Sequence, residues 1–308
     1  MYRHFFVPVG GTDAAIEAVG HALEFARSIG ARVTFFDACC EASAENRAAE
    51  RLAKAEAAAR AQGVPCACAP RAVAHTSGFA LEIVVELARA QGCDLLCASA
   101  DAPWLMRQRD AGDAFASCGM PVLMCTAQRH RVADLVIGKL LGQHRATGAQ
   151  LHALLCNMRA AVSRGEPSGA VAMDSIVAAL RNVQSLRDRP GKDACVFSRL
   201  RERTSAFDAE LDELEHQHRH EVRLLDALID SARAAAKDEL PPACFEQQLQ
   251  TCAQFVWEHM GREEGVILPA ARRYLSDADW QEIGAALAVV APSTNLEHTI
   301  GELRSSRA

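Results

Sequence analysis

The stretch FEQQLQTCAQFVWEHMGREEGVILPA, residues 245–270, decides the fold of the second half of this chain. Its apolar residues recur at alternating spacings of three and four, which is the period of a helix that buries one face. Two polar residues, His259 and Glu263, stand on that apolar stripe. The stretch therefore predicts a buried helix that brings an imidazole and a carboxylate into a core. The complete stripe is Phe245, Leu249, Cys252, Val256, His259, Glu263, Val266 and Ala270.

Two further segments have apolar stripes that polar residues interrupt. One stripe contains His144, and another contains His218 and Glu221 one helical turn apart. A less regular helical segment lies between them, and no convincing strand occurs after Val132. The sequence thus predicts an up-down four-helix bundle over residues 128–285 and a tail at 286–308. The two stripes are Ile137, Leu141, His144, Gly148, Leu151, Leu155, Met158 and Phe207, Leu211, Leu214, His218, Glu221, Leu225, Leu228, Ala232.

The polar residues on these stripes predict a metal site in the bundle core. A buried carboxylate without a partner costs several kcal/mol, so glutamates on a core face need partners. A metal ion is one such partner, and imidazole and carboxylate donors from facing helices suit iron, manganese or zinc. The alternative is a network of histidine–glutamate pairs that holds no metal.

The first half of the chain has a different pattern, in which short apolar runs alternate with helical periods. The runs lack the polar alternation of a half-exposed strand, which indicates a parallel sheet with helices on both faces. We therefore predict a doubly wound, five-stranded α/β domain over residues 1–127, with Gly10–Gly11 as a tight turn between strand and helix. The predicted strands are Phe5–Val9, Arg32–Ala38, Pro65–Ala74, Asp94–Ala98 and Pro121–Cys125.

Composition excludes several classes of function. The 308 residues, half of them apolar, suffice for about two domains with real cores. With 39 acidic against 33 basic residues and no long basic run, nucleic acid is not an expected partner. No apolar stretch of about 18 residues and no secretory signal occur, so we expect no membrane span and a cytoplasmic protein. The 12 cysteines lie scattered in apolar segments, as core residues do.

Short motifs in the second half resemble a known family. GQHR around His144, FSRLRER at 197–203, QHR around His218 and HMGREEGVILPAARRYL at 259–275 are similar to hemerythrin-like HHE cation-binding domains, over about residues 135–285. The resemblance implies a non-haem iron centre with histidine and carboxylate ligands. It also implies roles in oxygen binding, in iron or oxygen sensing, or in responses to nitric oxide or iron–sulfur damage. By position it assigns His144, His218, His259 and Glu263 as ligands.

The second helix departs from the family pattern. Arg189 stands where the family has a histidine, and only Asp193 keeps a carboxylate. On the third helix, Glu221 is three residues after His218, where the family commonly has a ligand four residues after it. These donors are enough for one metal ion but sparse for two. The sequence therefore leaves open whether the iron centre is mononuclear or dinuclear. The candidate ligands are His144, Asp193, His218, Glu221, His259 and Glu263.

A pair of histidines on the third helix is an alternative to His218 as a metal ligand. His216 and His220 are four residues apart, a spacing that can bind a metal, but they lie nearly opposite His218 on the helix. They replace His218 only if the helix is rotated. Otherwise they face solvent.

The first half resembles the universal stress protein family. The resemblance rests on VPVGGT at 7–12, RVTFFDA at 32–38, CDLLCAS at 93–99 and PVLMC at 121–125, and it covers about residues 1–127. It implies a five-stranded doubly wound fold and, in some members, ATP at the carboxyl ends of the strands. Gly10 replaces the usual aspartate, and Ser99–Ala102 replaces the glycine-containing phosphate loop. ATP is therefore disfavoured, and a structural or dimerising role is favoured.

The sequence as a whole predicts a stress-response or sensory protein that binds non-haem iron. The signal is expected to be metal, oxygen, nitric oxide or redox state, in a homodimer formed through the N-terminal domain. The alternatives are a metal-free, dimerising interaction protein and an ATP-binding stress regulator. No nucleophile elbow or paired catalytic acid and base is visible, so hydrolase or transferase activity is not expected.

Overall fold

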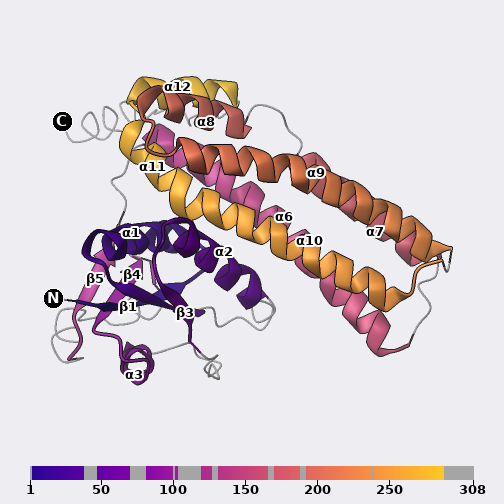
Figure 1. The fold of residues 1–308 in the computed structure, drawn as a ribbon, viewed down its shortest axis with the longest axis horizontal. Coiled ribbons are helices and arrows are strands. Elements are labelled where there is room, and N and C mark those ends of the chain that lie inside the picture. The colour runs from indigo at the N-terminus through magenta and orange to yellow at the C-terminus, as the bar shows by residue number, and fades with distance from the viewer. Residues whose placement is uncertain are drawn as a thin grey trace, which may run out of the picture.

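The computed structural model describes residues 2–37, 47–69, 81–99, 101–102, 119–126, 131–165, 170–187, 192–237 and 239–287. An α/β domain comes first, and a long helical domain follows it (Figure 1). The α/β elements are β1 (His4–Val9), α1 (Asp13–Ile29), β2 (Arg32–Asp37), α2 (Ala48–Ala61), β3 (Cys66–Cys68), α3 (Leu81–Ala90), β4 (Leu95–Ser99) and β5 (Val122–Cys125).

The predicted parallel sheet is confirmed. Its strands lie in the order β3-β2-β1-β4-β5, and all paired neighbours are parallel. The helices α1 and α2 pack on one face of the sheet and α3 on the other, as buried strand residues predicted. The third strand is shorter than predicted, and residues 70–74 of its predicted range lie outside the described residues.

The helical C-terminal region is confirmed, with more helices than four. The predicted second helix is divided into α7 and α8, and Pro190, a residue type that breaks helices, falls between them outside the described residues. None of the described helices is long and apolar enough to cross a membrane. The elements are α6 (Arg131–Ser163), α7 (Ala170–Arg187), α8 (Lys192–Arg203), α9 (Asp208–Ala236), α10 (Pro242–Arg262), the π-helix η2 (Glu263–Ile267), α11 (Leu268–Tyr274) and α12 (Asp277–Ala286).

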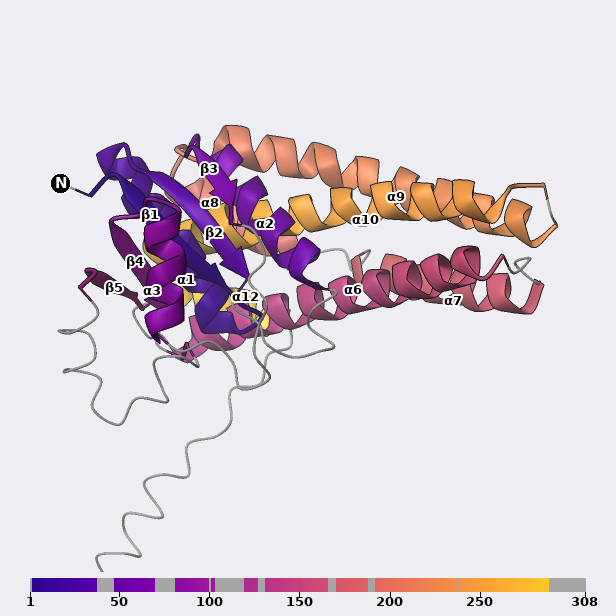
Figure 2. The same ribbon diagram turned by 90° about the horizontal axis from the view of Figure 1, so that it is seen from below.

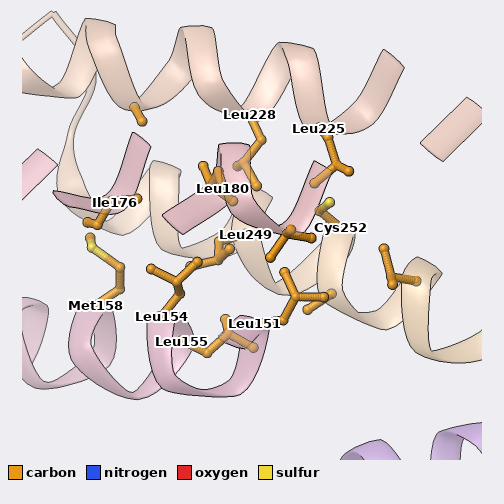
Figure 3. Packing of buried hydrophobic residues seen from close by; sticks show 14 of the residues in the cluster. Leu151, Leu154, Leu155, Met158, Ile176, Leu180, Leu225, Leu228, Leu249 and Cys252 are labelled. Atoms are coloured by element: carbon orange, nitrogen blue, oxygen red, sulfur yellow. The ribbon is translucent and has the colours of Figure 1, made fainter. Parts of the chain in front are cut away.

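The bundle core consists of two apolar clusters. A distal cluster joins leucines of α6, α7, α9 and α10 (Figure 3) and also includes Ala53 of α2. A proximal cluster joins α6, α8, α9, α11 and α12 near the α/β domain. Along α6, Leu141 belongs to the proximal cluster and Leu151 to the distal one, with His144 buried between them. The polar residues of the predicted stripes thus form a layer between two apolar halves.

The two domains pack closely through α2, which lies between the sheet and α10 (Figures 1 and 2). Glycines on the helical domain make this approach possible. A Cβ at Gly261 would collide with the backbone of Lys54, and one at Gly265 would collide with Ala58. On α1, a Cβ at Gly20 would lie 2.7 Å from Pro269. The interface therefore requires small residues on both sides, and the helix axes cannot separate without loss of these contacts.

This packing predicts opposite effects for two glycine-to-alanine changes in helices. Alanine normally stabilises an exposed helix interior by about 1 kcal/mol relative to glycine. Gly261→Ala should instead lower the free energy of unfolding, because its methyl group meets the Lys54 backbone. In Gly142→Ala the new Cβ would have only the tip of Arg145 within 4 Å, at 3.8 Å, so this control should stabilise. Urea denaturation of the two variants measures the difference, and equal stabilisation would contradict the close interface.

Candidate metal centre

A buried carboxylate, Glu263, lies at the centre of the polar layer. Its Oε2 is 2.9 Å from Nε2 of His144, and its Oε1 is 2.9 Å from Nε2 of His259 and 3.3 Å from Nε2 of His218. His144 belongs to α6, His218 to α9, His259 to α10 and Glu263 to η2. Three α-helices therefore direct their imidazoles at one carboxylate on the π-helix.

The histidines differ in how they are buried and held. His259 has no exposed surface, and its Nδ1 lies 3.1 Å from Oε1 of Gln217. The His218 side chain is 28 % exposed, and its ring centre is 4.3 Å from that of His259. His218 thus forms the edge of the site that faces solvent. The rotated-helix alternative does not occur, because His216 is exposed and His220 packs against Phe255.

A π-helix places two adjacent carboxylates in the core. In a regular α-helix neighbouring residues point about 100° apart, so one side chain of a Glu–Glu pair would turn away from a narrow buried face. The chain instead widens into η2 at Glu263–Ile267, and both Glu263 and Glu264 are buried. Such insertions are frequent at functional sites. Here the insertion gives the site a second acidic group.

Glu264, which sequence reasoning missed, contacts the other side of His144. Its Oε1 is 3.0 Å from Nδ1 of His144 and accepts a 2.8 Å hydrogen bond from Nζ of Lys54. Lys54 belongs to α2 of the α/β domain. Each ring nitrogen of His144 therefore faces a carboxylate, and one of these carboxylates is paired across the domain boundary. The available signal was the second glutamate of the Glu–Glu pair, which lies off the α-helical stripe.

The electrostatics keep both carboxylates ionised. Burial alone raises the pKa of Glu263, but the charge of His259 and hydrogen bonds from the three imidazoles hold that pKa well below its usual value. Burial likewise opposes ionisation of Glu264, and Lys54 and His144 lower its pKa. Burial lowers the pKa of His144, but hydrogen bonds to Glu263 and Glu264 outweigh it and raise this pKa to about 8.

The other two predicted ligands, Glu221 and Asp193, belong to α9 and α8. Glu221 is buried on α9, one turn beyond His218, where burial and the charge of Glu221 raise the pKa of the Cys252 thiol to about 12. Asp193 is in α8, but its side chain lies outside the described residues, as does Arg189. The described geometry therefore brings together His144, His218, His259 and Glu263 from the predicted set.

The donor set fits a transition-metal ion. One ligand atom each from His218, His259 and Glu263 lies within 4.8 Å of the others, and His144 faces the second oxygen of Glu263. Imidazole nitrogens with a carboxylate oxygen suit iron or zinc. Metal-binding histidines usually donate their other ring N–H to a carboxylate or carbonyl, as Glu264 and Gln217 allow here. The same contacts also form a complete hydrogen-bond network of the protein alone.

The central role of Glu263 predicts a large stability effect in metal-free protein. Glu263→Gln removes the charge that pairs with buried histidines, which should lower the free energy of unfolding by about 3 kcal/mol. Glu258→Gln is the control, since Glu258 is a neighbouring residue of α10 whose side chain is 39 % exposed. Its effect should stay below about 0.5 kcal/mol. Denaturation in the presence of a chelator measures the free energy of unfolding of both variants. Equally small effects would show that the charge of Glu263 does not stabilise the bundle.

Comparison with known proteins finds a family match in the second half of the chain. Residues 135–271 match the family model of the Hemerythrin HHE cation binding domain. Among solved structures, the first half is similar to a universal stress protein family member from Burkholderia pseudomallei, with 21 % identity and a TM-score of 0.32, over 41 % of this chain and 97 % of that one. No curated protein matches the chain. The match at 135–271 confirms the resemblance to HHE domains.

Proposed function

Since the helical domain matches a cation-binding family, we propose that it binds one transition-metal ion, iron, through His144, His218, His259 and Glu263. The observation that supports this most is the convergence of three imidazole Nε2 atoms on one buried carboxylate, at 2.9, 2.9 and 3.3 Å. A bound ion would supply a positive charge between these donors in place of shared protons. Iron is favoured because the resemblance to HHE domains implies it.

The number of donors favours one ion. The second helix offers only Asp193, because Arg189 replaces the histidine of the family pattern. A guanidinium near a second cation would also repel it. Three nitrogens and one oxygen complete a four-coordinate site, or leave positions open in a larger coordination sphere.

We propose further that the domain has a sensory role. His218 lies on an edge that is open to solvent, whereas His259 and Glu263 are buried. A small molecule such as oxygen or nitric oxide could therefore reach an ion at this edge without opening the bundle. The site has no nucleophile activated by a neighbouring base among the described residues, which favours sensing over hydrolysis or group transfer.

The second candidate is a metal-free interaction protein. It is favoured by the same contacts, because the imidazoles and carboxylates satisfy one another without an ion. ATP binding has less support. The cavity at the carboxyl end of β5 and the start of α1 is lined by Asp13, Glu17, Asp101 and Asp134 as well as by two arginines. Those arginines already pair with Asp13, Glu17 and Asp134, so a triphosphate would meet negative charge.

Metal content separates the two candidates. Protein reconstituted anaerobically with Fe²⁺ and desalted should retain about one iron per chain, since the four donors make one site. His218→Ala should lose most of this iron because it removes a ligand. His216→Ala is the matched control on the same helix, and it should retain the iron because His216 is exposed. Elemental analysis measures all three proteins.

The opposite results favour the metal-free candidate. Iron far below one per chain in the wild type would reject the metal site. Equal iron content in His218→Ala and wild type would show that the iron binds at a place other than the proposed ligands. Retention of zinc or manganese in place of iron would support the proposed site but show that its ion is not iron.

A further inference from the structure

We propose that Lys54 of the α/β domain is a positioning residue of the metal centre, so that the centre is complete only when the two domains are docked. This inference rests on the proposed function, because it concerns how the same site binds its ion. It extends that function by giving the α/β domain a direct part in the site. Its geometric basis is a continuous line of buried contacts from α2 to the ligand His144.

The first step is the contact between Lys54 and Glu264. The two charged atoms, Nζ and Oε1, are 2.8 Å apart, and the side chains are only 10 % and 5 % exposed. A buried carboxylate that loses its cationic partner is strongly destabilised. Lys54 therefore fixes the position of a carboxylate that belongs to the other domain.

The second step is the contact between Glu264 and His144. The oxygen that accepts from Lys54 also lies 3.0 Å from Nδ1 of His144. A carboxylate at one ring nitrogen sets the orientation of the imidazole and selects which nitrogen faces the ion. Here it directs Nε2 of His144 at Glu263, 2.9 Å away. Lys54 thus acts on the ligand through Glu264.

The position of Lys54 is itself constrained from both sides. On α2, Glu50 lies 3.4 Å from Nζ of Lys54 and also pairs with Arg47. Glu50 reaches the bundle because Gly148 of α6 has no side chain, and a Cβ there would collide with the Glu50 carboxylate. The Lys54 backbone rests on Gly261 of α10. These close contacts restrict the ammonium group to the space between Glu50 and Glu264.

This arrangement couples metal binding and domain docking. If docking of α2 improves the affinity of the site for an ion, the ion must strengthen the docking of α2 by the same factor. Partners of metal-bound histidines typically contribute 10- to 100-fold in metal affinity. Binding or release of the ion would therefore change the free energy with which the α/β domain docks on the bundle.

The experiment compares Fe²⁺ affinity of full-length variants by anaerobic competition with a colorimetric chelator. Lys54→Met should weaken binding at least about tenfold, because Glu264 loses its cation. Arg60→Met is the matched control, since Arg60 also lies on α2 and pairs across the domain boundary with Glu258, at 3.0 Å but on the surface. It should change affinity less than about twofold.

A second variant tests whether Lys54 acts through Glu264. Glu264→Gln keeps an oxygen that can accept from Nδ1 of His144 but removes the charge that Lys54 neutralises. In the Glu264→Gln background, Lys54→Met should have little further effect on Fe²⁺ affinity, because the two residues act as one unit. Additive losses would overturn the proposed line of contacts.

A measurement on the wild type avoids variants that fail to fold. Fe²⁺ should slow amide hydrogen exchange in α2, which touches the bundle, and leave α3 on the opposite face of the sheet unchanged. Wild-type protein that binds Fe²⁺ with no change in α2, or Lys54→Met that binds Fe²⁺ as the wild type does, would overturn the coupling and leave the metal site standing. Failure of the wild type to bind Fe²⁺ would instead reject the proposed function, and this inference with it.

Discussion

The bundle depends on one buried carboxylate, Glu263, which must stay ionised between two apolar clusters. Burial opposes that charge, and the charge of His259 and hydrogen bonds from three imidazoles compensate for it. These contacts fix the rotation of α6, α9 and α10, because each helix must keep its histidine in the polar layer. The apolar residues on either side then fill the distal and proximal clusters. One electrostatic requirement thereby sets the register of the core.

The same requirement extends to the α/β domain. The π-helix that buries Glu263 also buries Glu264, which needs its own cation. Lys54 provides it, and only a helix very close to α10 can bring a lysine there. Gly261 and Gly265 permit that approach. The small residues, the π-helix and the buried lysine are therefore parts of one solution to the cost of two adjacent buried carboxylates.

Periodicity predicted the helices and the convergence of His144, His218, His259 and Glu263, because a 3.6-residue period determines which side chains share a face. It missed Glu264, since an insertion into a helix is a tertiary effect that leaves no trace in local periodicity. It also missed Lys54, which the sequence places in an alanine-rich helix of another domain. Contacts between residues 210 positions apart follow from domain docking, and one sequence does not encode docking in any local pattern.

In the proposed metal site, the small number of ligands gives the buried Lys54 a role in holding them. A site with fewer histidines depends more on the orientation of each remaining one, because a misplaced ligand leaves fewer donors to retain an ion. His144 is held from behind by Glu264 and His259 by Gln217. In the proposed site, the Lys54–Glu264 pair would therefore add support to His144 from a second domain, outside the bundle.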